Sequence, residues 1–331
     1  MAEYLLLGDI HLSDRPPSAC TDTYLDDLFD LLGASIDLAR QRRVAAVIWA
    51  GDVFHHKVPT RTSHATVRRL IDTARAYPCP VYVVPGNHDL ANDRFASIEE
   101  GQPLGVLLAS GAVRLLHGWM DTCGGDSAPV YGVPWLMRFD DDMVADALAD
   151  WRDRLALPRR RADRASLGPA LVVAHAPLYP PGQELQFEYY RAGAWAAAMG
   201  GHGSVYYGHV HEPHGVYTAD GVTFANAGAL SRGSLHEHNL TRPVQVATWN
   251  AQDGAFTLHT LPHKAAGEVF RLTEARERRQ AQMDLDAFLA SVGQASVEVT
   301  SIEAVLAHLA TLDLGPEVLA LAEELLVGAG A

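Results

Sequence analysis

The feature that most constrains this sequence is a series of short apolar runs, each of which ends abruptly in polar residues. The first two runs, residues 4–8 and 44–50, are separated by residues 25–36, where apolar side chains recur at helical spacing. A second helical pattern lies before the third run, residues 81–84. Strand, helix, strand, helix, strand is the order of parallel βαβ units, so the sequence predicts an α/β fold.

Each apolar run leads into residues that turn the backbone sharply or bind metal ions. Later runs, residues 171–174 and 205–207, end in the same way. In a strand, residues two apart point to the same side, so an Asp-x-His or His-x-His pair can face one site. Because the ends of successive strands can meet at one edge of a sheet, we expect the clusters to converge. In chain order they are Asp9-Ile10-His11, Gly51-Asp52, Gly86-Asn87-His88-Asp89, His175 and Gly208-His209-Val210-His211.

The donor groups in these clusters are carboxylate, amide and imidazole, without a thiolate. This mixture suits Mn²⁺, with Fe or Zn as alternatives. The carboxylate of Asp52 has two oxygens and can bridge two cations. Two cations roughly 3.5–4 Å apart neutralise a phosphate group and lower the pKa of bound water toward neutral pH. The ordered set predicts a two-metal phosphoesterase, although each cluster alone also suits a turn or a surface hydrogen-bonding pair.

The second half of the sequence changes character twice. Between residues 215 and 261, short alternating runs predict strands in antiparallel pairing. From about residue 268, apolar residues recur at helical spacing. We therefore expect a catalytic domain at residues 1–263 and a mostly helical C-terminal segment at residues 264–331.

In their order, the clusters resemble those of the calcineurin-like metallophosphoesterase superfamily over residues 9–211. Within it, the sequence is most similar to the SbcD-type DNA repair nucleases, through Gly51-Asp52-Val53-Phe54-His55 and the Val58-Pro59 that opens a helix. The resemblance implies a two-sheet β-sandwich flanked by helices, with a small C-terminal helical unit. It also implies Mn²⁺-dependent cleavage of phosphodiesters in DNA. One departure is Asn226-Ala227-Gly228-Ala229, where relatives often have Asn-Pro-Gly-Ser.

The resemblance implies which residues hold the two divalent cations, with Asp52 shared between them. One cation would be held by Asp9, His11, Asp52 and His211, and the other by Asp52, Asn87, His175 and His209.

The same resemblance implies three catalytic roles outside the ligand set. His88 would protonate the leaving oxygen, and His55 would position the phosphate. Asp89 would orient His88 from behind. An alternative for His55 is that it forms, with His56, a solvated pair at the entrance of a helix.

Possible partners are DNA, an ATPase and a second copy of the chain. The net charge of −14 argues against binding polyanions through the overall field. Arginine runs at 152–164 and 271–279 either contact DNA or form solvated helix faces. The apolar C-terminal helices suit docking of an SbcC-type coiled-coil ATPase, a helical hairpin with its own core, or a homodimer. The acidic charge and the Asn226 loop favour a rival function, a small-molecule phosphodiesterase or phosphatase; a second rival is a scaffold for the ATPase.

The sequence indicates a cytoplasmic location. Cys20, Cys79 and Cys123 are far apart and form no disulfide or metal-binding pattern. The N-terminus shows no basic region or cleavage site of a signal peptide. No apolar run reaches the ~18 residues of a membrane span, so we expect no membrane partner.

Overall fold

The computed structural model describes residues 2–120, 128–138, 140–155 and 168–274, and further positions at 276–277, 280, 283, 309 and 315–321. The chain forms two compact units, Met1–Phe270 and Arg271–Ala331. Every helix and strand described below lies in the first unit. The boundary after residue 263 stays a prediction, and the expected C-terminal helices fall largely outside the described residues.

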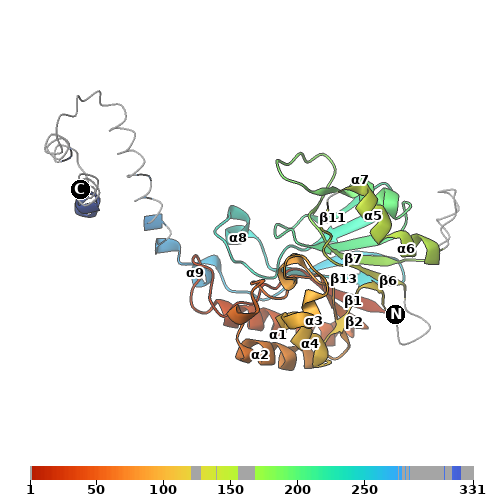
Figure 1. Cartoon of the computed structure of the whole chain (residues 1–331), viewed down its shortest axis with the longest axis horizontal. Helices are drawn as coiled ribbons and strands as arrows, with labels where there is room; N and C mark the ends of the chain where they lie inside the picture. The colour runs from red at the N-terminus through yellow and green to blue at the C-terminus, as the bar shows by residue number, and fades with distance from the viewer. Residues whose placement is uncertain are drawn as a thin grey trace. The chain divides into compact units, whose positions relative to one another are not determined.

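The first unit contains two six-stranded sheets, which confirms the predicted α/β sandwich (Figure 1). In the first sheet, β1 to β4 are parallel neighbours, and β13 and β14 join antiparallel beside β1. Its strands, in spatial order, are β14 (Phe256–Thr260), β13 (Gln245–Asn250), β1 (Glu3–Leu7), β2 (Ala46–Trp49), β3 (Val81–Val83) and β4 (Arg114–Leu115).

The second sheet has a parallel centre and antiparallel edges. Strands β12, β10, β7 and β6 are parallel neighbours, whereas β11 and β5 pair antiparallel at the two ends. In spatial order the strands are β11 (Gly215–Ala219), β12 (Val222–Asn226), β10 (Ser204–Gly208), β7 (Leu171–His175), β6 (Val130–Val133) and β5 (Gly118–Trp119). A separate two-stranded parallel ribbon consists of β8 (Leu178–Tyr179) and β9 (Tyr190–Arg191).

The strands between residues 215 and 261 were expected to form an antiparallel sheet, and this prediction is wrong in one respect. They form two antiparallel hairpins, β11–β12 and β13–β14, which lie in different sheets. Both hairpins read in the sequence as short runs of alternating apolar and polar residues. The sequence pattern therefore does not say to which sheet each hairpin belongs, and packing decides it.

The helices cover the outer faces of the two sheets. Figure 1 shows α1 to α4 on the side of β1 and β2, and α5 to α7 on the side of the second sheet. The helices are α1 (Tyr24–Arg42), α2 (His64–Arg75), α3 (Ser97–Gly101), α4 (Pro103–Ala109), α5 (Asp141–Ala147), α6 (Ala149–Arg154), α7 (Ala192–Ala198), α8 (Glu237–Thr241) and α9 (Ala266–Val269), with the 3₁₀ turns η1 (Pro59–Arg61) and η2 (Asn87–Asp89).

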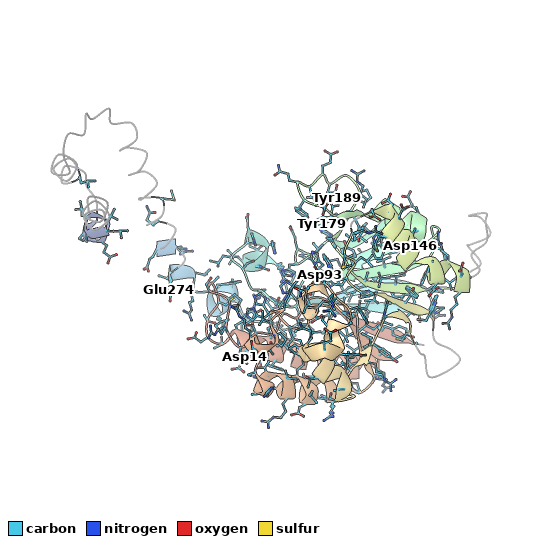
Figure 2. The ribbon with its side chains drawn as sticks, in the orientation of Figure 1. Asp14, Asp93, Asp146, Tyr179, Tyr189 and Glu274 are labelled. Atoms are coloured by element: carbon cyan, nitrogen blue, oxygen red, sulfur yellow. The ribbon has the colours of Figure 1, made fainter. Side chains whose placement is uncertain are left out.

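The core has separate layers on the two faces of the second sheet. Leu6, Ile48, Val173 and Tyr206 lie fully buried between the sheets. A second cluster, which includes Trp151 of α6, fills the space between α5–α7 and the outer face of the second sheet. Because both faces of the parallel strands are covered, their sequences are continuously apolar. Figure 2 draws the side chains in the orientation of Figure 1, and they fill the interior of the first unit.

The described part of the chain contains no helix that is long and apolar enough to cross a bilayer. The cytoplasmic location stays a prediction.

Candidate metal centre

The predicted clusters meet where the carboxyl ends of the parallel strands from both sheets adjoin. The buried carboxylate of Asp9, after β1, accepts the backbone N–H of His209, after β10, at 2.9 Å and 3.0 Å. The backbone N–H of His11 donates to the carbonyl of Asp52 at 2.9 Å. In the second sheet, His175 is the register partner of Gly208. These contacts join loops that lie up to 200 residues apart in the sequence.

The glycines of the clusters are needed because ligand side chains touch the backbone. Gly51 has φ +99°, and a Cβ there would lie 2.2 Å from Nδ1 of His175. A Cβ at Gly86 would lie 2.2 Å from Oδ1 of Asp52. Such distances exclude a side chain at either position, so the two glycines let Asp52 and His175 come together.

The first group of donors contains Asp9, His11 and His211, whose ligand atoms lie within 4.8 Å of one another. Nε2 of His11 lies 2.9 Å from Nε2 of His211 and 3.6 Å from Oδ2 of Asp52. His11 is buried and has φ +52°, an uncommon backbone conformation for a non-glycine residue. Within the described ranges, Nδ1 of His11 has no hydrogen-bond partner. Two imidazole nitrogens that face each other beside a carboxylate suit a shared cation better than a hydrogen bond.

The second group contains Asp52, His175 and His209, also within 4.8 Å of one another. Nε2 of His175 lies 3.4 Å from Oδ1 of Asp52 and 3.1 Å from Oδ1 of Asn87. The same Asn87 oxygen lies 3.0 Å from Nδ1 of His209. Nδ1 of His175 donates to the carbonyl of Ala50 at 2.7 Å, which leaves Nε2 free to act as a ligand.

Asp52 lies between the two groups. Its Oδ2 faces His11, and its Oδ1 faces His175. With Asp52 shared, each group offers four donors of carboxylate, imidazole or amide type, the set that suits Mn²⁺, Fe or Zn. The residues therefore fit a pair of divalent cations.

The electrostatics of the centre also favour a cation. Burial opposes protonation of His175, but Asp52 and then Asp9 outweigh it and raise its pKa to about 9. Burial, followed by the charge of His175, lowers the pKa of His209 to about 3. Buried carboxylates that attract a proton to His175 also attract a metal ion, and metal binding requires these histidines to be neutral.

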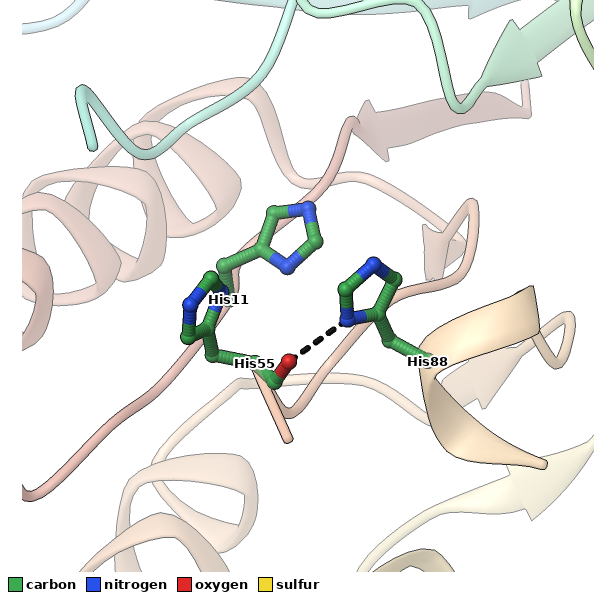
Figure 3. Close-up of side chains that lie close together, drawn as sticks. All are labelled: His11, His55 and His88. Carbon is green, nitrogen blue, oxygen red and sulfur yellow. Dashed lines mark hydrogen bonds between the residues drawn. The ribbon is translucent and has the colours of Figure 1, made fainter. Parts of the chain in front are cut away.

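A third group, His11, His55 and His88, lies beside the first (Figure 3). The rings of His55 and His88 stack with centroids 5.8 Å apart. Nδ1 of His88 lies 2.5 Å from the carbonyl oxygen of His55, so Nδ1 carries a proton and donates it to that oxygen. Burial, followed by the charge of His56, lowers the pKa of His55 to about 4. Nε2 of His88 is then the ring nitrogen available to a substrate.

The expected contact between Asp89 and the His88 ring is not what the structure shows. The buried Asp89 carboxylate accepts backbone N–H groups of Gly86, Val53 and Phe54 at 3.0–3.3 Å. Burial, and then the charge of Asp52, raise the pKa of Asp89 to about 7. Asp89 therefore ties the turn of Asn87 to the turn of Asp52, while the carbonyl of His55 orients His88.

Two residues at the site were not singled out as site residues from the sequence. The ring of Trp135, which follows β6, lies 4.8 Å from that of His209 and 6.0 Å from that of His175. Asn226 is buried, and its Nδ2 donates to the carbonyls of Tyr207 and Val210 on either side of His209. Trp135 has no pattern that marks it. Asn226 could have been found as a polar residue that ends an apolar strand.

The arginine runs are only partly visible. Arg152 and Arg154 lie on α6, and the guanidinium of Arg154 lies 4.6 Å from the centre of the Trp119 ring. Residues 156–167 lie outside the described residues, as does part of 271–279. Their contact with DNA stays a prediction.

The fold and the converging donors are those of a metal-dependent phosphoesterase. The family model of calcineurin-like phosphoesterases matches residues 3–213. This match covers more than half of the 331 residues, so the chain belongs to the calcineurin-like phosphoesterase family. The family predicted from the motifs is confirmed.

Individual relatives are distant. The chain is 22% identical over 233 residues to the DNA double-strand break repair protein Mre11 of Saccharolobus solfataricus, covering 69% of this chain and 54% of that protein. It thus spans about half the length of this curated relative. A dimetal phosphatase from Danio rerio shares the fold, with a TM-score of 0.54, 13% identity, and 80% of this chain and 97% of that one covered. The protein TT1561 of Thermus thermophilus has a TM-score of 0.47, 13% identity, and 79% and 99% covered.

Proposed function

We propose that this phosphoesterase is a Mn²⁺-dependent phosphodiesterase that acts on DNA, as an exonuclease or single-strand endonuclease of the SbcD type. The observation that supports a binuclear site is the Asp52 carboxylate, whose two oxygens face two groups of donors. The substrate class is supported by the distant similarity to Mre11 and by the Phe54-His55 extension of the Gly-Asp turn.

In this proposal the two cations are Mn²⁺ ions that share Asp52. When bound, they supply the positive charge that neutralises a phosphate group and that lowers the pKa of water. The remaining ligands would be Asp9, His11 and His211 on one side, and Asn87, His175 and His209 on the other.

The protein's own residues supply proton transfer and orientation. His88 donates from Nδ1 to the carbonyl of His55, so the proton for the leaving oxygen would be a second one, carried on Nε2 of the imidazolium form. His55, stacked on His88, would position the phosphate. Asp89 would fix both turns through the backbone rather than act on the substrate.

The direct test is a comparison of substrates with the same protein. Purified enzyme is given end-labelled single-stranded and duplex DNA, bis(4-nitrophenyl) phosphate and 4-nitrophenyl phosphate, with Mn²⁺, Mg²⁺, Zn²⁺ or a chelator. We expect DNA and the diester to be cleaved with Mn²⁺ and neither to be cleaved with chelator. Cleavage of the monoester alone would reject the phosphodiesterase assignment.

A small-molecule phosphodiesterase or phosphatase is the second candidate. Two observations favour it: the net charge of −14, and the fact that both polar atoms of Asn226 bond to backbone rather than face a substrate. This candidate predicts a higher kcat/KM on aryl or nucleoside esters than on any oligonucleotide.

Partners beyond the substrate belong to the same proposal. An SbcC-type ATPase would dock on the C-terminal segment, residues 264–331, and a homodimer is the alternative use of that segment. Co-purification of the full chain with such an ATPase, with truncation after Phe270 as comparison, tests the docking. If the chain were only a scaffold, Asp52→Ala would leave its biological function intact.

A further inference from the structure

A pocket of about 450 Å³ lies beside the candidate metal centre, between the loop after β1 and the loop after β2. Among the residues that line it are His55, His56, Arg15 and Arg61. The pocket is thus formed mainly by basic and hydroxyl side chains and by two prolines. Its position gives it one wall in common with the site, because His55 belongs to both.

The histidines form a continuous line from the metal ligands into the pocket. The ring of His55 lies 5.5 Å from that of the ligand His11 and 4.7 Å from that of His56. Nε2 of His56 lies 3.3 Å from the Ser13 hydroxyl, which itself donates to the carbonyl of Arg15 at 2.7 Å. A group bound beside His56 would therefore lie next to a phosphate bound beside His55, on the side away from the predicted metal ligand His11.

The two arginines at the pocket carry charges that no described carboxylate neutralises by direct contact. Arg40, Arg42, Arg69 and Arg94 each form an ion pair with a carboxylate. No ion pair within 4.0 Å is found for Arg15 or Arg61 among the described residues. Both are exposed, and both line the same pocket as His56, whose pKa is lowered by burial and then by the charge of Arg61.

The acidic residue at the pocket is Asp14, which is labelled in Figure 2 and accepts three hydrogen bonds. Its Oδ2 accepts the backbone N–H of Ser63 at 2.6 Å, and its Oδ1 accepts the hydroxyls of Ser63 and Thr66 at 2.7 Å and 2.5 Å. Burial would raise the pKa of Asp14, but these hydrogen bonds hold it below its usual value. Asp14 therefore joins the loop after β1 to the start of α2 and fixes the pocket in shape.

Unpaired guanidinium groups in a fixed, polar pocket suit an oxyanion, because the planar fork of arginine matches a phosphate. We propose that Arg15, Arg61 and His56 bind a second phosphate of the substrate, adjacent to the phosphate beside His55. The pocket thereby selects substrates with consecutive phosphodiesters over isolated esters. This inference rests on the proposed function and names the feature by which the same site recognises a polynucleotide.

The test uses the full chain, the double variant Arg15→Gln/Arg61→Gln, and Arg68→Gln as a matched control. Arg68 is an exposed arginine of α2 outside the pocket. Binding of a fluorescein-labelled oligothymidylate is measured by anisotropy in chelator, where no cleavage occurs. Inhibition of bis(4-nitrophenyl) phosphate hydrolysis is measured with thymidine 5′-monophosphate and with thymidine 3′,5′-bisphosphate, which differ by one phosphate.

We expect the double variant to bind the oligonucleotide about tenfold more weakly, and the plot of log Kd against log salt to be less steep by about 0.7, for one lost single-strand phosphate contact. The Ki of the bisphosphate should rise by about the same tenfold factor, because the variant loses a charge-assisted contact to its second phosphate. The Ki of the monophosphate and the kcat/KM of the aryl diester should stay within about twofold, and Arg68→Gln should match wild type in every assay.

Two failures are distinguishable. If the double variant binds the oligonucleotide like wild type, or the bisphosphate inhibits both proteins equally, the second-phosphate subsite is wrong while the phosphodiesterase stands. If the wild-type protein hydrolyses no ester with any cation, the proposed function is wrong, and the binding measurement in chelator still decides whether the pocket holds phosphate.

Discussion

The two sheets contribute different chemistry to one site. The loops after β1, β2 and β3 supply the oxygen donors, which are Asp9, Asp52 and Asn87, together with His11. The end of β7 and the loop after β10 supply imidazoles alone, from His175, His209 and His211. Neither sheet holds enough donors for a pair of cations by itself. The site therefore exists only when the sheets pack against each other, and cation binding stabilises that packing.

This difference has a consequence for substitutions. In the proposed site, a carboxylate of the first sheet would carry the charge that attracts the cations, whereas an imidazole of the second sheet would be a neutral donor. Replacing Asp52 should therefore weaken cation binding and activity more than replacing any single histidine of the second sheet.

Asp52→Ala removes the carboxylate that faces both groups of donors. We expect both cations to be lost and turnover of the diester to fall by about 10⁴-fold or more, since a metal pair supplies several kcal/mol of transition-state stabilisation. Metal content measured by mass spectrometry, alongside kcat, checks this. Asp72→Ala, on the exposed side of α2, is the control. An Asp52→Ala protein that retains two cations would remove the shared role of Asp52.

His88→Gln tests a residue near the cations that is not counted among their ligands. We expect both cations to stay bound and kcat to fall by roughly 10²–10⁴-fold, the usual range for loss of a general acid. His64→Gln, exposed at the start of α2, should have no effect. Wild-type turnover in His88→Gln would overturn the proposed proton transfer.

His209→Ala removes one neutral donor of the second sheet. We expect affinity for one of the two cations to fall by more than about 100-fold, beyond the 10–100-fold typical of residues that only orient a ligand. Excess Mn²⁺ should restore part of the activity, which it should not do for Asp52→Ala. Calorimetric titration with Mn²⁺ separates the two cases, with His236→Ala as an exposed control. Equal losses in His209→Ala and Asp52→Ala would contradict the ranking of the sheets.

Asn226→Ala tests the brace that holds the His209 and His211 loop. Its side chain accepts from the backbone of His214 and Gly228 and donates to the carbonyls of Tyr207 and Val210. We expect a loss of about 1–3 kcal/mol in the free energy of unfolding, from buried groups left unpaired, and about 10-fold weaker binding of cations. Chemical denaturation with and without Mn²⁺ measures both. Unchanged stability would mean that the loop holds its shape without Asn226.

Much of this site follows from the sequence, because its parts are local. Asp9 with His11 and Gly51 with Asp52 end apolar runs, and the period of a strand and the freedom of glycine place such residues at an edge. The βαβ order of the first half has the same origin.

The features that could not be predicted from the sequence depend on how the two sheets pack. The hairpins β11–β12 and β13–β14 alternate alike, yet one lies in each sheet. The carboxylate of Asp89 bonds to backbone N–H groups that lie 35 and 36 residues away as well as in its own turn. The ring of Trp135 contacts that of His209, and the loop that carries Trp135 contains no recognisable motif. Such contacts are set by the pairing of the sheets, which local periodicity does not contain.

The most direct test of the central idea is a crystal of the protein soaked in Mn²⁺, with anomalous diffraction collected at the manganese edge. We predict two anomalous peaks roughly 3.5–4 Å apart, one on each side of the Asp52 carboxylate. A single peak, or peaks away from the edge where the two sheets meet, would contradict a site built jointly by both sheets.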